Sequence, residues 1–457
     1  MKLLAHIAVC SAGFTTLAAA QARNNFANSI PPTYGPANST IFQLSADPEF
    51  AFLLEATLSL AENEGSNTGE VLRIATDIIP GNISTYYSFA ERIGALAESI
   101  DPAVDPAGAR ETYFRSSTYY RDSVYLLVAN ASDPRLYSVW DKALADFRKA
   151  ISLLPAPGEA VTLKAHNSSI GPFEIPTYMF KSSSCNDRLP TVIVGKGYDG
   201  PQEELYHLSC ANILKRGINC ITYEGPGQPT PRRAGHPFIT DWNSVITPIV
   251  DYLHTRPDVD TTRILLLGNS FGGLLAPLAA AKEHRLSAMF LLDGLPNFRQ
   301  AVTVQFPPQL TGLYNDSKAD EFYEAILQNL DNPDFGSGFY YIWEYTFWGL
   351  KTSDPFTAWK RLGDFLWNET TAAEIGKLPV YVAKGQDDNT TLFEPDLARK
   401  YLEEGRPNGK NLTYYHEFLT SLGAGEHTSI GAESRIYVSF FAWLSEVWGG
   451  YKFGNTF

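Results

Sequence analysis

The chain has 457 residues, 44% of them hydrophobic, and a formal net charge of -14. This length and composition are ample for a large α/β domain with a smaller domain beside it. The acidic balance and the lack of any basic run argue against nucleic-acid binding, because phosphate contacts need clustered Lys and Arg. We therefore expect a neutral or apolar small-molecule partner.

The N-terminal segment has the pattern of a secretory signal peptide. Lys2 precedes a short apolar run, and the small residues at Ala20-Gln21-Ala22 resemble an A-x-A cleavage site. A membrane anchor is the alternative, but the run is short for a membrane span. We expect residues 1–20 to be removed, which predicts a secreted or secretory-pathway protein with no membrane span in the mature chain.

Asn-x-Ser/Thr sequons and the few cysteines agree with that route. The sequons begin at Asn38, Asn82, Asn130, Asn167, Asn315, Asn368, Asn389 and Asn411, which predicts a glycoprotein. Once Cys10 leaves with the signal peptide, Cys185, Cys210 and Cys220 permit at most one internal disulfide. The sequence contains neither Cys-x-x-Cys nor His-Glu-x-x-His, so we predict no metal site.

Helical spacing dominates the region before residue 155. Apolar residues recur three and four positions apart in segments such as 52–60 and 137–144. Prolines and a glycine at 155–158 end this pattern, and the period of the apolar residues then changes. We predict a helical cap domain at 21–157 and a catalytic domain at 158–457.

The catalytic region alternates strand patterns with helix-like stretches. The strand patterns lie at 160–165, 173–180, 191–194, 218–223, 263–267, 288–292, 379–383 and 412–418. The first two predict a hairpin, and the later alternation predicts a mostly parallel sheet covered on both faces. An aromatic-rich insertion at about 296–376 is too long for a simple connection and predicts a helical lid.

The most informative motif is Gly268-Asn269-Ser270-Phe271-Gly272, which directly follows the predicted strand at 263–267. A Gly-x-Ser-x-Gly sequence between a buried strand and a helix is typical of a nucleophile elbow, in which a tight turn exposes the serine hydroxyl. A serine after the fifth of eight strands matches the α/β-hydrolase fold. We therefore predict that fold, with an N-terminal helical cap and a helical lid, and Ser270 as nucleophile.

A serine hydroxyl needs an imidazole to accept its proton. In this fold the order along the chain is Ser, acid, His. His416 lies inside the last predicted strand, which is the wrong place for a general base, whereas His427 lies in the glycine-rich loop that follows it. We predict His427 as the base.

A carboxylate must hold that imidazole in the right tautomer. The predicted strand at 379–383 leads into Gly385-Gln386-Asp387-Asp388, whose Gly-x-x-Asp spacing favours Asp388 as the acid. Asp387 remains an alternative because adjacent carboxylates cannot be separated by pattern. Asp293, after the sixth strand, is a further possibility.

Two backbone amides should bind the developing oxyanion, and we predict those of Tyr198 and Phe271. The loop that carries Tyr198, residues 195–200, also reads Gly-x-Gly-x-x-Gly, and Glu224 closes the next strand, as in a dinucleotide-binding site. Pro201 and the position of the loop after the third strand argue against that alternative, so we predict no cofactor. A catalytically silent binding protein is another alternative.

Four motifs resemble those of fungal and bacterial α/β-hydrolases related to 2,6-dihydropseudooxynicotine hydrolase, yellowish-green pigment hydrolases and fusarin-type hydrolases. They lie at 197–204, 223–228, 267–273 and 423–427. The resemblance covers most of residues 190–440 and implies a Ser-Asp-His triad that cleaves carbon-carbon bonds beside ketones, shortens polyketide chains or closes lactam rings. One departure is Pro229, which follows Gln228 where the family often has glycine.

The residues and the resemblance together predict a serine-dependent hydrolase for a bulky apolar carbonyl compound. The resemblance favours a polyketide or polyketide-peptide hybrid in secondary-metabolite biosynthesis. A secreted general carboxylesterase is the alternative function.

Overall fold

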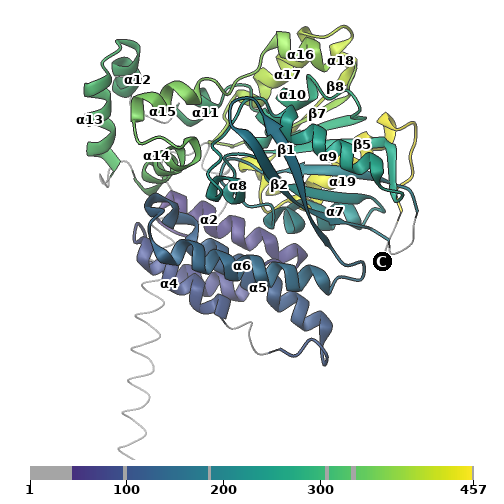
Figure 1. The fold of residues 1–457 in the computed structure, drawn as a ribbon, viewed down its shortest axis with the longest axis horizontal. Coiled ribbons are helices and arrows are strands. Elements are labelled where there is room, and N and C mark those ends of the chain that lie inside the picture. The colour runs from purple at the N-terminus through teal and green to yellow at the C-terminus, as the bar shows by residue number, and fades with distance from the viewer. Residues whose placement is uncertain (1–43, 96–99, 184–186, 304–307, 331–335, 455–457) are drawn as a thin grey trace, which may run out of the picture.

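The structure is a computed structural model that describes residues 44–95, 100–183, 187–303, 308–330 and 336–454 (Figure 1). The predicted signal peptide, Cys10, Asn38 and Cys185 lie outside the described residues. No helix in the described ranges combines the length and the apolar character that crossing a membrane requires.

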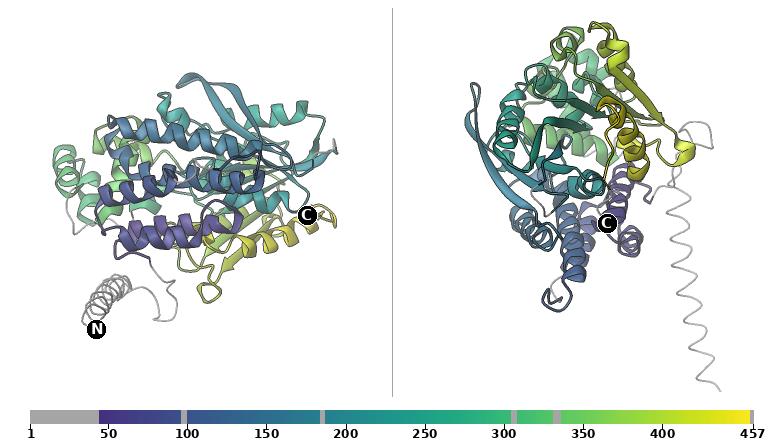
Figure 2. Two further views of the ribbon diagram at one scale, coloured as in Figure 1. Left: turned by 90° about the horizontal axis from the view of Figure 1, so that it is seen from below. Right: turned by 90° about the vertical axis from the view of Figure 1, so that its right-hand side faces the viewer.

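The first described segment is helical, as its apolar spacing predicts. Its elements are α2 (Pro48–Ser59), η1 (Leu60–Asn63), α3 (Thr68–Asp77), α4 (Ile83–Gly94), α5 (Pro106–Tyr125), η3 (Leu126–Asn130) and α6 (Pro134–Ser152). Asp47, Asp105 and Asp133 cap α2, α5 and α6, each just before a proline in the first turn. These N-terminal helices lie side by side beneath the sheet (Figures 1 and 2).

An eight-stranded sheet follows, in the order β1-β2-β4-β3-β5-β6-β7-β8. The strands are β1 (Glu159–Asn167), β2 (Gly171–Phe180), β3 (Leu189–Gly195), β4 (Asn219–Tyr223), β5 (Val259–Asn269), β6 (Ala288–Leu292), β7 (Val380–Gly385) and β8 (Thr413–Phe418). β1 and β2 form the predicted hairpin, and every pair from β4 to β8 is parallel. This is the predicted α/β-hydrolase fold.

Helices cover both faces of the sheet, and the alternation of side chains along each strand divides the core accordingly. On β5, Ile264 and Leu266 pack with α9 (Asn243–Thr255) and α10 (Gly272–Ala280). Leu265 and Leu267 point to the other face, towards α7 (Ala211–Leu214) and α19 (Glu433–Val447). The parallel strands are therefore apolar on both faces, as the continuous hydrophobic runs in the sequence predict.

The insertion between β6 and β7 is helical. It consists of α11 (Phe298–Thr303), α12 (Pro308–Asn315), α13 (Ala319–Leu330), α14 (Gly336–Leu350), α15 (Pro355–Leu362) and α16 (Glu369–Ile375). Most of these helices gather beside the sheet and next to the N-terminal helices, and α14 contacts α2 and η3 (Figure 1). Two segments of the chain that are far apart in sequence thus meet beside the sheet.

The remaining elements are short and connect or follow the strands. They are η4 (Tyr206–Cys210), α8 (Pro229–Arg233), α17 (Glu394–Glu404), α18 (Gly409–Leu412), η6 (Thr420–Leu422) and η7 (His427–Ser429). Pro229 occupies the first turn of α8, where the fixed φ angle of proline suits a helix start. The departure from the family motif therefore coincides with a helix that begins at that residue.

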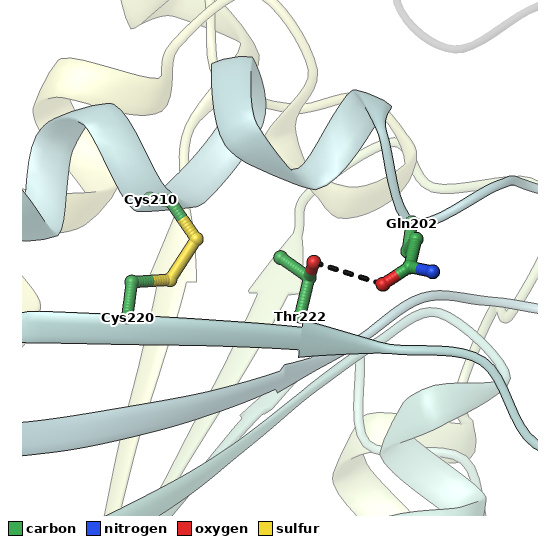
Figure 3. Close-up of a disulfide and its surroundings, with 4 residues drawn as sticks. All are labelled: Gln202, Cys210, Cys220 and Thr222. Atoms are coloured by element: carbon green, nitrogen blue, oxygen red, sulfur yellow. Dashed lines mark hydrogen bonds between the residues drawn. A yellow bond between two sulfur atoms is a disulfide. The ribbon is translucent and has the colours of Figure 1, made fainter. Parts of the chain in front are cut away.

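A disulfide between Cys210 and Cys220 joins the end of η4 to β4 (Figure 3). Gln202, at the start of the same helical segment, accepts a hydrogen bond from the Thr222 hydroxyl of β4 at 3.1 Å. Both contacts attach the segment after the Gly195–Gly200 loop to the strand beneath it.

Candidate active site

Ser270 lies in a tight turn between β5 and α10. Its φ angle is 57°, in the left-handed region that residues other than glycine rarely adopt. The Ser270 amide donates to the Leu292 carbonyl of β6 at 2.9 Å, which holds the turn against the neighbouring strand. Gly272 passes so close to the β3 loop that a Cβ there would lie 2.9 Å from the Gly195 carbonyl oxygen. The small residues of the motif are therefore required by close backbone packing.

The structure brings His427 and Asp388 to this serine. His427 begins η7 and is 7% exposed. Its Nε2 lies 2.8 Å from Ser270 Oγ, and its Nδ1 lies 2.9 Å from Asp388 Oδ2. His416, in contrast, lies on β8, where its Nδ1 is 3.1 Å from Ser439 Oγ. The loop histidine is the one that meets the elbow.

The two adjacent carboxylates after β7 point to different partners. Asp388 is buried, and its Oδ1 accepts from the amides of Thr390 and Thr391 at 2.7 and 3.0 Å. The Thr391 hydroxyl donates to Asp388 Oδ2, the same oxygen that faces His427. Asp387 instead accepts from the Thr420 hydroxyl at 2.6 Å. Geometry therefore separates the two acids that the sequence pattern leaves open.

Asp293 also reaches the imidazole. It is fully buried just after β6, and its Oδ2 lies 3.1 Å from His427 Nδ1. The same oxygen accepts from the Thr428 amide, whereas Asp293 Oδ1 has no hydrogen-bond partner in the described part of the chain. The imidazole thus lies between two carboxylates, Asp388 at the shorter distance.

This arrangement shifts the pKa values of all three groups. Burial opposes the charge of His427, but Asp388 and Asp293 together raise its pKa to about 10. Burial also disfavours the charged form of Asp388, yet the imidazolium and its hydrogen bond bring the pKa of that carboxyl below its ordinary value. Burial, and then the charge of Asp388, raise the pKa of Asp293 to about 6. The geometry therefore favours a charged imidazole paired with ionised Asp388.

Among the described residues, the group with the donor set of a metal site is this same trio of Asp293, Asp388 and His427, whose ligand atoms lie within 4.8 Å of one another. Nε2 of His427 faces the serine hydroxyl, and the carboxylates accept from His427, amides and a hydroxyl. These contacts are those of a hydrogen-bonded proton relay.

The loop after β3 lies against the serine. A Cβ on Gly197 would be 3.0 Å from Ser270 Cβ and 3.2 Å from its Oγ, so a larger residue here would crowd the serine. The amides of Tyr198 and Phe271, the predicted oxyanion donors, have no acceptor among the residues that the structure describes. The rings of these two residues meet edge to face at 5.4 Å. Both N–H groups are thus without a partner among the described residues, as an oxyanion donor requires.

The neighbouring Glu224 bears on the dinucleotide alternative. It is fully buried, and its two oxygens accept from the amides of Gln202 and Thr230 at 3.0 and 2.8 Å. A carboxylate that binds a ribose must be open to the ligand. Glu224 is occupied within the protein, which favours the oxyanion interpretation of the loop.

Side chains from the N-terminal helices and the insertion hold the same loop. Asp199 Oδ2 accepts from the hydroxyls of Tyr125 and Tyr341, the latter at 2.9 Å. Arg121 donates to the Asp199 carbonyl at 3.1 Å. The loop is therefore attached to α5 and to α14 at one residue.

Helix α2 also contacts the site. The Phe52 ring lies 6.2 Å from the His427 ring, between centroids. Glu55, one turn further along, has its pKa raised to about 8 by burial and by the charge of Glu426, the residue before His427. A helix that precedes the sheet by a hundred residues thus covers part of the imidazole.

Sequence reasoning missed Phe52, Asp199 and the Thr391 hydroxyl. Phe52 is one apolar residue of a helical pattern, so nothing in the sequence marks its contact with His427. Thr391 lies three residues after Asp388 in an Asp-Asn-Thr-Thr turn. This Asx-turn pattern could have indicated a carboxylate oriented by the residues that follow it.

The comparisons with known proteins agree with the α/β-hydrolase fold described above. A family model described as the alpha/beta hydrolase family matches residues 197–416. The alpha/beta hydrolase psoB of Aspergillus fumigatus is 30% identical over 311 residues, which cover 63% of this chain and 68% of that protein. The 20-hydroxy-prefusarin hydrolase FUS2 of Gibberella moniliformis is 25% identical over 411 residues, covering 86% and 95%.

Among solved structures, the 2,6-dihydroxy-pseudo-oxynicotine hydrolase is similar with a TM-score of 0.64 and 19% identity. The similarity covers 87% of this chain and 97% of that protein, so it is a similarity of fold that extends beyond the residues matched by the family model.

Replacement of each of the three carboxylates by its amide should separate their contributions. We expect Asp388→Asn to slow the reaction of Ser270 with a fluorophosphonate by about 10³-fold to 10⁴-fold, because the amide no longer holds the imidazole in the required tautomer. At a pH above the midpoint of each variant, Asp293→Asn should give a smaller loss and Asp387→Asn almost none, since Asp387 faces Thr420. Equal losses for Asp387→Asn and Asp388→Asn would contradict this assignment.

The pH dependence of that reaction should report the raised pKa of His427. Only the neutral imidazole accepts a proton, so the rate should rise with pH through a midpoint well above about 6.5, the ordinary value for histidine. Asp293→Asn removes one of the two negative charges that stabilise the imidazolium, so it should move the midpoint to lower pH. Second-order inactivation rates measured from pH 5 to 10 test this expectation, and an unchanged or higher midpoint in the variant would contradict it.

Proposed function

The chain belongs to the alpha/beta hydrolase family, and from this premise we propose that it is a serine hydrolase with Ser270 as nucleophile, His427 as general base and Asp388 as the acid that orients it. The observation that carries this proposal is the unbroken hydrogen-bonded path from Ser270 Oγ through His427 to Asp388, at 2.8 and 2.9 Å. These distances are within the reach that nucleophilic catalysis requires.

The proposed reaction proceeds in two transfers. Ser270 Oγ attacks a carbonyl carbon as its proton passes to His427 Nε2, and the carbonyl π electrons move onto the oxygen. The amides of Tyr198 and Phe271 bind that oxyanion. When the tetrahedral adduct collapses, the leaving group takes the proton from His427 Nε2 and the acyl group stays on Ser270. Water, activated by the same imidazole, then releases the acid.

For the substrate we propose a bulky apolar carbonyl compound. Rings from the insertion and from the segment between α8 and α9 lie against the oxyanion loop: Tyr198 contacts Phe238, Phe298 and Tyr345 at centroid distances of 5.0, 4.6 and 5.0 Å. Such surroundings suit an apolar ligand better than a polar one. The similarity to the 20-hydroxy-prefusarin hydrolase supports a polyketide or polyketide-peptide hybrid in secondary-metabolite biosynthesis, with an ester, carbon-carbon or ring-closing acyl transfer reaction.

Labelling with a fluorophosphonate tests the nucleophile, because this reagent adds only to an activated serine. We expect intact-mass spectrometry to find one adduct on the wild type and none on Ser270→Ala. Absence of labelling on the wild type would favour a binding protein without catalysis.

Competition with the same labelling reaction tests the substrate class. A bulky β-dicarbonyl polyketide analogue should slow the labelling at concentrations where p-nitrophenyl butyrate does not. Rapid turnover of that short ester, with no competition by the analogue, would instead indicate a general carboxylesterase.

We further propose that the protein enters the secretory pathway, loses residues 1–20 and carries N-linked glycans. The Cys210–Cys220 disulfide supports an oxidising compartment. Asn82, Asn315, Asn368 and Asn411 are exposed, as an acceptor site requires. Asn167, in contrast, is 3% exposed and donates to Asp241, so it is not a glycan site in this proposal.

Expression of the full chain in a yeast host tests this route. The secreted protein should begin near residue 21, lose mass on treatment with an N-glycosidase, and show no change of that mass loss in Asn167→Gln. A full-length chain retained in the cytosol without glycans would contradict the proposal.

A further inference from the structure

The motif Tyr223-Glu224-Gly225-Pro226-Gly227-Gln228 has no role in the reaction described above, although it forms part of the family resemblance. Gln228 is fully buried and lies just before α8, yet its side chain does not cap that helix. Instead its Nε2 donates to the carbonyls of Lys196 and Gly197 at 3.0 and 3.1 Å. Its Oε1 accepts from the Gly225 amide at 2.8 Å. One side-chain amide thus binds two successive carbonyls of the oxyanion loop.

These two bonds orient two peptide planes. In a planar trans peptide the C=O and the N–H of the same unit point in opposite directions, and the described chain contains no cis peptide bond. Since the carbonyls of Lys196 and Gly197 both point at Gln228, the amides of Gly197 and Tyr198 both point away from it. Two successive amides on one side of a loop form the concave arrangement that binds anions.

The loop so oriented is the one that touches the nucleophile. A Cβ on Gly197 would lie 3.2 Å from Ser270 Oγ. Neither the Gly197 amide nor the Tyr198 amide has an acceptor among the residues described here. We infer that Gln228 is a positioning residue for the reaction, because it turns the amides of Gly197 and Tyr198 towards the oxyanion formed at Ser270. This inference rests on the proposed function.

The surroundings hold Gln228 rigidly enough for that role. The Gln228 amide donates to the Gly225 carbonyl at 3.0 Å, and Gly227 has a φ of +89°, which glycine adopts without strain. Glu224 links Gln202, two residues after the loop, to Thr230 in α8. These hydrogen bonds hold the backbone on both sides of Gln228 in place, so the position of its side chain is restricted.

Loss of the Gln228 side chain should raise the free energy of the transition state more than that of the bound ground state. Without its Nε2, two buried carbonyls lose their donor and the two peptide planes are free to rotate. Removal of one oxyanion donor typically lowers kcat by about 10²-fold to 10³-fold. Because the amides remain in Gln228→Met and lose only their orientation, we expect a loss of about 10²-fold. Ground-state binding should change little, since the amides are aimed at the oxyanion.

The test uses the kinetics of labelling by an alkyl fluorophosphonate, whose addition to Ser270 also places an oxygen in the oxyanion hole. Gln228→Met and the isosteric Gln228→Glu both remove the N–H donors. In each we expect kinact to fall about 10²-fold while KI stays within about twofold of wild type. Gln202→Met is the matched control: this glutamine is equally buried in the same network, but its side chain bonds Thr222 and neither loop carbonyl.

The outcomes separate this inference from the proposed function. If the wild type is not labelled at Ser270, the proposed function fails and the role of Gln228 fails with it. If the wild type is labelled but a folded Gln228 variant keeps its kinact within about threefold of Gln202→Met, the proposed function stands and the inference about Gln228 is overturned. A matching rise in KI would indicate a general distortion of the site and would also overturn it.

Discussion

The site depends on one constraint, the close approach of backbone segments around Ser270. The serine takes a φ of 57°, which costs conformational energy that the surrounding contacts must offset. The Leu292 carbonyl binds its amide, and Gly272 and Gly197 bring the helix start and the β3 loop to within contact of the turn. Glycine at these two positions makes the close approach possible, because a side chain at either would crowd the neighbouring segment. The serine hydroxyl, the helix amides and the loop amides consequently share one small volume.

A second feature, the burial of an imidazole between two carboxylates, follows from that meeting point. A buried charge is costly unless it is paired and hydrogen-bonded. Asp388 provides His427 with both an opposite charge and a hydrogen-bond acceptor. The hydroxyl and amide of Thr391 donate hydrogen bonds to Asp388 in turn. Asp293 adds a second negative charge, and its Oδ1 has no partner in the described ranges of the chain. In the proposed mechanism this charge stabilises the imidazolium that forms on serine attack, at the expense of a base that is neutral only at higher pH.

The N-terminal helices and the helical insertion complete the site from two sides. Asp199 binds tyrosines from both regions, so the oxyanion loop is anchored by segments that are distant in sequence. Helix α2 adds Phe52 against the imidazole. Gln228 holds the other side of the same loop. The proposed catalytic groups follow the ends of strands. The residues that orient and cover them come from the N-terminal helices, the insertion and the segment before α8.

The sequence by itself determined the strands and the elbow, because continuous apolar runs and a Gly-x-Ser-x-Gly turn are local signals whose physical causes lie within a few residues. It also placed His427 in a loop and Asp388 in a turn after a strand. It left Asp387, Asp388 and Asp293 as alternatives, since the spacing of carboxylates does not say where their side chains point. Only the tertiary structure decided that Asp388 and Asp293 face the imidazole while Asp387 faces Thr420. Phe52, Asp199 and Gln228 likewise contact segments that are distant in the sequence, and no local pattern indicates those contacts.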